Sequence, residues 1–278
     1  MDKIVITVAP TGNVPTRART PHVPITPEEI AQSVKECRQA GAALAHLHAR
    51  DAGQHPTYRG EVFRDIVAAV RANSDVITQV STGARAGRTA AERAQCLAAG
   101  AEMASLTTGS SNFATQVNDN APDLVEHLCR EMAQRGVVPE IEVFDAAMIS
   151  LAVALAEKGL VPKPLHFNLV LGVPGSLPGT PKNLFFLYES LPRYGELAKG
   201  LTWQVTVVGP SHVDLSVMAM SLGGNVRVGL EDNIYYSRGI LAANPHLVER
   251  MVGIARAMGR EPATPDEART ILGLPRPQ

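Results

Sequence analysis

The sequence predicts an α/β protein folded as a closed (β/α)8 TIM barrel. Two observations lead to this prediction: apolar, strand-like runs alternate with helical patterns eight times, and no linker-like break in composition interrupts them. Helices between successive strands imply parallel pairing, and eight such units in about 260 residues suit a barrel. An open doubly wound sheet is the alternative, although the first strand–helix turn lacks the G-x-G-x-x-G pattern of a dinucleotide site. We expect residues 1–278 to form a single barrel domain with a short C-terminal helical tail.

The predicted strands are the eight apolar runs, each followed by polar or glycine-containing residues. They cover residues 3–9, 42–48, 76–80, 103–106, 137–144, 165–171, 201–208 and 225–230. Between them, helix starts are marked by a threonine three residues before a glutamate, the capping-box pattern, at Thr26, Thr89 and Thr264. Further helices are predicted over residues 121–134 and 244–258.

The composition argues against several classes of partner. The 278 residues include 26 Lys and Arg against 27 Asp and Glu, and 4% are aromatic, so neither a basic face nor a stacking platform for nucleic acid is indicated. No apolar run approaches the roughly 18 residues that suggest a membrane span, and the first residues lack a signal-peptide layout. Cys37, Cys96 and Cys129 lie in helical patterns typical of buried thiols in a reducing compartment, so we expect a cytoplasmic protein.

Two histidines one residue apart end the second predicted strand. Side chains two apart on a strand point to the same side, so His46 and His48 would project together from its carboxyl end. Two neutral imidazoles suit one divalent metal ion, with Zn²⁺ the first choice. The alternative is that one histidine bonds a neighbouring carbonyl while the other is solvated.

The eighth predicted strand supplies charged residues that complement this pair. Arg227 and Glu231 share one side of the segment, and Glu231 would complete a set of two histidines and one carboxylate. Asp232 would then lie beside the metal as a general base, and the planar fork of Arg227 suits a substrate carboxylate. A purely structural Arg–Glu pair at the barrel mouth is the alternative.

Polar residues also collect toward the carboxyl ends of the other predicted strands. Because barrel active sites lie at the carboxyl ends of the strands, we expect these side chains to gather on one face. They are Thr11, Asn13, Ser81, Thr82, Thr107, Thr108, Asn112, Glu140, Glu142, His166 and Asn168.

Several motifs together resemble the β-keto acid cleavage enzymes, the family first met as the 3-keto-5-aminohexanoate cleavage enzyme of lysine fermentation. The resemblance runs nearly end to end. It rests on residues 6–12 (ITVAPTG), 46–50 (HLHAR), 79–83 (QVSTG), 103–110 (MASLTTGS), 139–145 (PEIEVFD) and 224–233 (GNVRVGLEDN).

The resemblance implies a zinc-dependent (β/α)8 barrel, usually a homotetramer, which converts a β-keto acid and acetyl-CoA into acetoacetate and a new acyl-CoA by Claisen and retro-Claisen steps. It implies His46, His48 and Glu231 as zinc ligands and Asp232 as the base. Arg227 would orient the keto acid, and Glu142 would lie close to the site. The substrate contacts that we expect are Asn13, Ser81, Thr82 and either Thr107 or Thr108.

Two departures from the family pattern bear on specificity. Where the aminohexanoate-cleaving members carry a carboxylate suited to an ammonium group, this chain has Asn13, which favours a neutral or hydroxylated keto acid. After the seventh predicted strand, residues 208–212 (VGPSH) lack the arginine expected behind the glycine, which leaves one CoA or substrate contact open.

Two other functions remain as alternatives at this stage. A metal-dependent hydrolase of the amidohydrolase type is also a barrel with H-x-H, and His166 and Asp232 would fill its later positions. However, its H-x-H belongs on the first strand, and its fifth strand carries a histidine where this chain has Glu142. A barrel without catalytic activity, in which His46 and His48 are structural, would bind no stoichiometric zinc.

Overall fold

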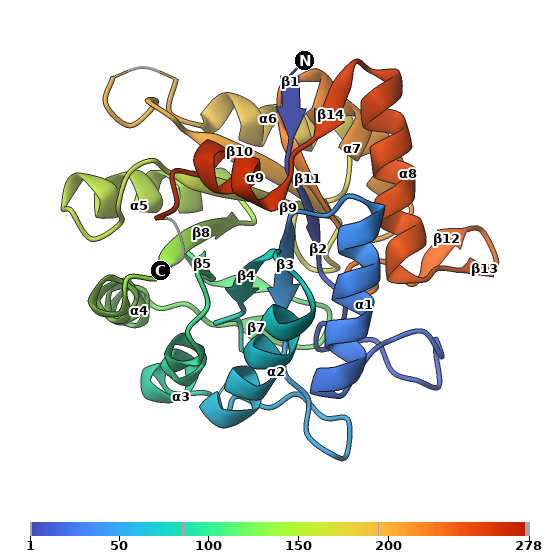
Figure 1. The fold of residues 1–278 in the computed structure, drawn as a ribbon. Helices are drawn as coiled ribbons and strands as arrows, with labels where there is room; N and C mark the ends of the chain where they lie inside the picture. Colours follow the sequence, from blue (N-terminus) through green and yellow to red (C-terminus); the bar gives the residue numbers. More distant parts are fainter. Residues whose placement is uncertain (1, 85–86, 194, 276–278) are drawn as a thin grey trace.

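The computed structural model describes residues 2–84, 87–193 and 195–275, and within these the predicted barrel is confirmed. Eight strands of the described part close on one another, and every neighbouring pair is parallel. In order around the barrel (Figure 1) they are β2 (Ile6–Val8), β3 (Leu44–Leu47), β4 (Ile77–Val80), β5 (Met103–Thr107), β8 (Val138–Val143), β9 (His166–Leu171), β10 (Thr202–Val207) and β11 (Asn225–Val228).

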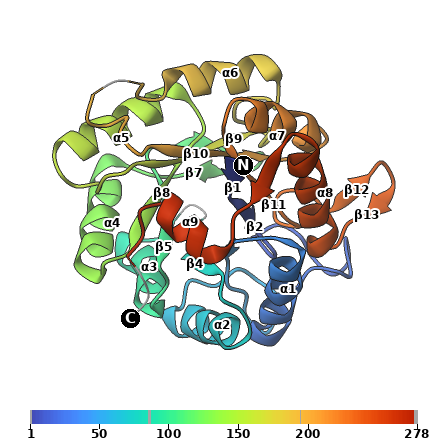
Figure 2. The same cartoon turned by 45° about the horizontal axis from the view of Figure 1, so that its top comes forward.

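Helices surround the barrel as an outer ring (Figure 2). The ring comprises α1 (Pro27–Ala40), α2 (Gly60–Asn73), α3 (Ala90–Ala94) with the 3₁₀ helix η1 (Gln95–Ala99), α4 (Pro122–Arg135), α5 (Ala146–Glu157), α6 (Pro181–Ser190), α7 (His212–Ser221) and α8 (Asn244–Ala257). The capping boxes predicted from sequence are present at Thr26, Thr89 and Thr264. In each, the threonine side chain accepts from the glutamate N–H while the glutamate reaches back to the threonine N–H.

The first apolar run does not form one strand, as the sequence predicted, but two. β1 (Asp2–Ile4) pairs with β14 (Arg260–Pro262), a strand that the sequence did not predict, and only β2 enters the barrel. The short helix α9 (Pro265–Ile271) follows β14 and crosses the barrel end where the strands begin (Figure 2). Its Ala268 and the adjoining Leu272 form a separate apolar cluster with Leu44 and Ile77, which seals that end.

Two small antiparallel hairpins were also missed. They are β6 (Ser111–Asn112) with β7 (Val117–Asn118), and β12 (Tyr235–Ser237) with β13 (Ile240–Leu241). Each lies in a loop after a barrel strand and is too short for a periodic signal. Cys37, Cys96 and Cys129 are buried free thiols, as predicted. Within the described ranges, no helix is both long and apolar enough to cross a membrane.

Candidate active site

The predicted metal ligands converge at the end of the barrel where the strands finish. His46 lies in β3 and His48 directly follows it, and Glu231 lies three residues beyond β11, the strand that closes the barrel against β2. His46 Nε2 and His48 Nε2 are 3.3 Å apart, and Glu231 Oε1 lies 3.1 Å from His48 Nε2 and 3.9 Å from His46 Nε2. These three ligand atoms all lie within 4.8 Å of one another.

A glycine turn brings Glu231 to the two histidines. Gly229 has a φ of +151°, and a Cβ there would overlap the carbonyl oxygen of Ala9, so the two segments approach as closely as only glycine permits. The Glu231 N–H then donates to the same Ala9 oxygen over 3.2 Å. Gly12, at φ +62°, packs against the Glu231 side chain from the loop after β2.

The donor set fits a divalent metal ion of zinc type. Zinc bonds of about 2.0–2.1 Å at tetrahedral angles separate two ligand atoms by about 3.3 Å, close to the separations between the histidine nitrogens and between His48 and Glu231. Glu231 Oε2 is buried and has no hydrogen-bond partner among the described residues. Two imidazoles and one carboxylate leave a fourth position for a substrate oxygen.

The second ring nitrogen of His46 has its own partner. Its Nδ1 lies 2.6 Å from Oε1 of Gln79 in β4, so an N–H on Nδ1 donates to the amide and Nε2 keeps a free lone pair. Burial, followed by the charge of Arg227, lowers the pKa of His46 to about 3. The imidazole is therefore neutral at physiological pH, as a metal ligand must be.

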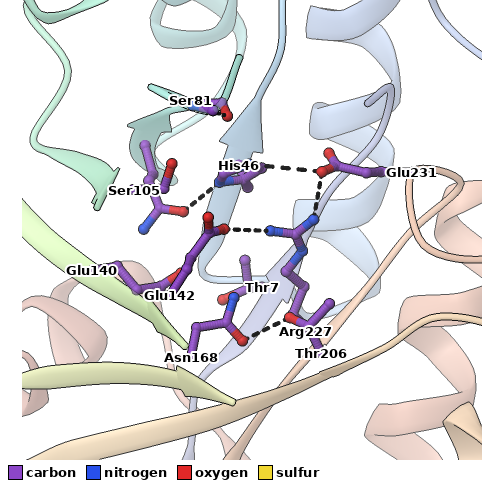
Figure 3. A network of polar contacts seen from close by, with 12 residues as sticks. Thr7, His46, Ser81, Ser105, Glu140, Glu142, Asn168, Thr206, Arg227 and Glu231 are labelled. Atoms are coloured by element: carbon purple, nitrogen blue, oxygen red, sulfur yellow. Dashed lines mark hydrogen bonds and ion pairs between the residues drawn. The ribbon is translucent and has the colours of Figure 1, made fainter. Parts of the chain in front are cut away.

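One guanidinium faces three carboxyl groups beside these ligands, and Figure 3 labels two of them, Glu142 and Glu231. Arg227 Nε and Nη2 each donate to an Asp232 oxygen over 3.0 Å, and Nη2 also donates to Glu231 Oε1 over 2.6 Å. Nη1 lies 3.6 Å from Glu142 Oε1. Because Arg227 and Asp232 are both buried, each removes much of the other's desolvation cost.

The three carboxyl groups around Arg227 differ in their pKa values. Burial raises the pKa of Asp232 to about 6, with the charge of Glu231 adding to the effect and Arg227 opposing it. Burial also raises the pKa of Glu142, against the opposing charge of Arg227. Burial works in the same direction on Glu231, but Arg227 and the two histidines outweigh it and hold its pKa well below the usual range. Glu231 is thus the acid that stays ionised most readily.

Thr107 is the last residue of β5 and Thr108 follows it. Only Thr107 is directed at the carboxyl groups around Arg227. Thr107 Oγ1 donates to Glu142 Oε2 over 3.1 Å, whereas Thr108 Oγ1 donates to the Met148 carbonyl oxygen over 2.8 Å and points toward α5. Side-chain alternation along a strand places such neighbours on opposite sides. The structure therefore separates two residues that the sequence left equivalent.

The other predicted substrate contacts lie on the loops around the mouth. Ser81 is buried at the end of β4 near His46 (Figure 3), and its Oγ accepts from the Gly83 N–H over 3.2 Å. Thr82 is occupied with the neighbouring strand, because its Oγ1 donates to the Ser105 carbonyl oxygen over 2.7 Å. Asn13 is half-buried on the loop that packs against Glu231.

His166 was assigned to the wrong end of its strand. It is the first residue of β9, and its Nδ1 lies 2.6 Å from Oγ1 of Thr202, the first residue of β10. It therefore lies at the sealed end of the barrel, remote from Asp232. This removes the histidine on which the amidohydrolase alternative depended.

Sequence reasoning also missed Gln79 and Gln204, two buried amides inside the barrel. Both lie within strands that read as apolar runs, and neither follows a strand end. The available signal was a long polar side chain within a short buried run, with Gln79 between Thr78 and Val80 and Gln204 between Trp203 and Val205. A polar side chain in a buried strand must face either the barrel interior or a helix.

Comparisons with known proteins agree over almost the whole chain. A family model described as beta-keto acid cleavage enzyme matches residues 3–274. The chain is 42% identical over 277 residues to a 3-keto-5-aminohexanoate cleavage enzyme of Fusobacterium nucleatum, covering 99% of each protein. It is 39% identical over 273 residues to a 3-oxoadipate:acetyl-CoA acetyltransferase of Cupriavidus necator, covering 98% of this chain and 95% of that one.

Solved structures share the barrel. A ternary complex of ObcA with a C4-CoA adduct and oxalate has a TM-score of 0.80 at 24% identity, over 93% of this chain and 68% of that chain. A type I 3-dehydroquinate dehydratase of Clostridium difficile has a TM-score of 0.58 at 9% identity, over 93% of both chains. At these identities the likeness shows the fold alone.

Substitution of either histidine tests the convergence of these ligands. We expect His46→Ala and His48→Ala to lose bound metal, because removing one of three protein ligands leaves too few for tight binding. The measurement is metal content of the purified variants by mass spectrometry. His22→Ala, which removes an exposed histidine, should keep the wild-type content. Wild-type metal content in either site variant would exclude this site.

Proposed function

The chain belongs to the β-keto acid cleavage enzyme family, and we propose that it condenses a β-keto acid with acetyl-CoA and cleaves the adduct to acetoacetate and a new acyl-CoA. The observation that carries this proposal is the convergence of His46, His48 and Glu231 beside the Arg227–Asp232 pair. One set can hold a metal ion, and the other offers a base and a cation within the same pocket.

We assign the metal as Zn²⁺, held by His46, His48 and Glu231. Two imidazoles and a carboxylate are a common ligand set of catalytic zinc. When bound, zinc would supply Lewis-acid stabilisation of negative charge that develops on the substrate's keto oxygen. His46 is held in the tautomer that a ligand needs by its hydrogen bond to Gln79.

Asp232 would remove the proton between the two carbonyl groups of the keto acid. The resulting carbanion attacks the acetyl thioester and releases CoA thiolate, which then attacks the original keto carbon. Cleavage of the carbon–carbon bond gives the new acyl-CoA and the enolate of acetoacetate, and Asp232 returns its proton to that enolate. The proposed base is held for both transfers by its two bonds to Arg227.

The remaining residues would bind and orient the keto acid. Arg227 would contact its carboxylate through the Nη1 edge, where the pairing with Glu142 is the longest in the cluster. Ser81 and Thr107 would contribute hydroxyl groups, and Glu142 would position both Thr107 and Arg227. We assign Thr82 and Thr108 to supporting roles, since their hydroxyl groups already bond backbone carbonyls.

We further infer a single-domain cytoplasmic enzyme that forms a homotetramer. Free, buried cysteines suit a reducing compartment. The family resemblance implies a homotetramer, and this chain exposes large apolar side chains on α6 and on the β12–β13 hairpin, which suits contact between subunits. They are Phe185, Phe186, Tyr235, Tyr236 and Ile240. The molecular mass in solution, measured by light scattering, tests the subunit number.

A panel of β-keto acids tests the reaction. With acetyl-CoA, the wild-type enzyme should form acetoacetate and one new acyl-CoA per substrate cleaved, both identified by mass spectrometry. Asp232→Asn should retain zinc but lose about 10²–10⁴-fold in turnover, as expected for a lost general base.

Asp123→Asn, an exposed change of the same kind on α4, should retain wild-type turnover. Near-normal turnover of a folded Asp232→Asn variant would exclude Asp232 as the base. Hydrolysis of amides or lactones by the wild type without any thioester would contradict the proposed reaction.

Asn13 provides a test of substrate choice. An amide lacks the charge that selects an ammonium group, so we expect the wild type to prefer neutral or hydroxylated keto acids. Asn13→Glu should shift the ratio of kcat/KM values toward ammonium-bearing keto acids. Val14→Glu places the same charge one residue along on an exposed side chain and should leave the ranking unchanged. An unchanged ranking in Asn13→Glu would show that specificity lies elsewhere.

A further inference from the structure

A layer of four buried polar side chains lies inside the barrel beneath the candidate metal site. They come from alternate strands, as barrel layers do, with Thr7 on β2, Gln79 on β4, Glu140 on β8 and Gln204 on β10. Apolar Val, Ile and Leu dominate such layers in most barrels, so four polar residues require an explanation. None of the four is assigned a place in the reaction proposed above beyond the bond from His46 to Gln79.

Hydrogen bonds connect three members of this layer in one direction. Thr7 Oγ1 donates to Gln204 Oε1 over 2.9 Å, and Gln204 Nε2 donates to Glu140 Oε2 over 2.9 Å. The orientation of the Gln204 amide is therefore fixed at both ends. Glu140 is held by a donor that stabilises its ionised form.

Gln79 faces both the layer and the metal site. Its Oε1 accepts from His46 Nδ1 over 2.6 Å. Gln79 Nε2 and Glu140 Oε1 are both buried, and neither has a partner of good hydrogen-bond geometry among the described residues. Gln79 on β4 and Glu140 on β8 are consecutive members of this layer, so the layer holds an unpartnered donor and an unpartnered acceptor on neighbouring members. In agreement, Gln79 is one of the groups that lower the pKa of Glu140.

We propose that Glu140 and Gln79 are positioning residues for the metal ligand His46, with the Glu140 carboxylate acting on the imidazole through the Gln79 amide. This inference rests on the metal site of the proposed function. When Gln79 donates to Glu140, its amide is polarised and Oε1 becomes a stronger acceptor for the His46 N–H. The imidazole then becomes a stronger donor of its Nε2 lone pair.

The proposed arrangement resembles the carboxylate–histidine pair of many metal sites, with one residue, Gln79, added between the carboxylate and the histidine. A ligating histidine usually donates its other N–H directly to a carboxylate, backbone carbonyl or water, which fixes the ring and raises its basicity. Here an amide stands between the acid and the ring. Burial, with the neighbouring Glu142 adding, raises the pKa of Glu140 to about 7, so keeping a carboxyl here is costly to an apolar barrel interior. The positioning of His46 explains why a carboxyl group is kept at Glu140 despite this cost.

Zinc affinity, measured by competition with a chelating dye at pH 8, tests the proposal independently of turnover. Gln79→Met removes the bond to His46 and should weaken zinc binding by about 10–100-fold. Glu140→Gln keeps the shape but removes the charge, and should weaken binding in the same direction by on the order of tenfold. Thr206→Val, which breaks the 2.7 Å bond to Asn168 elsewhere inside the barrel, is the matched control and should bind zinc as the wild type does.

A swapped variant separates positioning from mere structural support. Gln79→Glu/Glu140→Gln keeps the total charge but places the carboxylate directly against His46, so zinc affinity should return at least to the wild-type value. Restoration is the result that a purely structural layer does not predict. The thermal stability of each metal-free variant is measured in parallel. The swap keeps the same two side-chain types and the total charge, so it tests the proposal if one single variant does not fold.

The possible outcomes separate the two proposals. If the wild type binds no zinc, the metal site fails, and this inference fails with it. If the wild type binds zinc but Glu140→Gln binds it equally well, or if the swapped variant stays as weak as Gln79→Met, the positioning role is wrong. In that second case the proposed reaction still stands.

Discussion

The structure of the site depends on one buried guanidinium set against three carboxyl groups. Arg227 bonds Asp232 and Glu231 and lies near Glu142, so a single positive charge faces three acids in a region from which water is largely excluded. An imbalance of this kind is costly unless protons or cations compensate for it. Two of the acids respond with raised pKa values, and the third points at two histidines. A divalent cation at the histidines would complete the compensation.

Much of this site could be predicted from sequence because its residues lie where strands end. His46, His48, Glu231 and Asp232 stand at the borders of apolar runs, and the barrel fold alone brings such borders together. Gln79, Glu140 and Gln204 lie deeper in their strands, and the sequence carries no sign of which polar groups will meet across the barrel. Their contacts depend on register, and sequence patterns fix register only loosely. Glu140 was expected at the carboxyl end of its strand, but it is the third residue of β8 and lies in the layer below the site.

The errors of prediction also have physical causes. The continuous run of residues 3–9 hid the change of partner between β1 and β2, since nothing in the sequence marks Val5, where the chain passes from one sheet to the other. His166 was misplaced although it is the first residue of its strand, and in a parallel barrel a side chain where the strand begins lies at the opposite end from the active site. Arg50 was quoted only as part of a motif. It is buried and donates to the carbonyl oxygens of Gly12, Pro15 and Gln54, which ties the loop after β2 to the site.

The apolar cluster beneath α9 determines from which end of the barrel reactants and products can enter and leave. With one end of the barrel closed by Ala268 and Leu272, both reactants must arrive, and both products depart, by the same opening. Two reactants that share one entrance can obstruct each other, so the fold favours an ordered arrival of reactants and departure of products. β1 and α9, the first and last elements of the described chain, lie at the closed end (Figure 2), so attaching the protein near either of them leaves its entrance free.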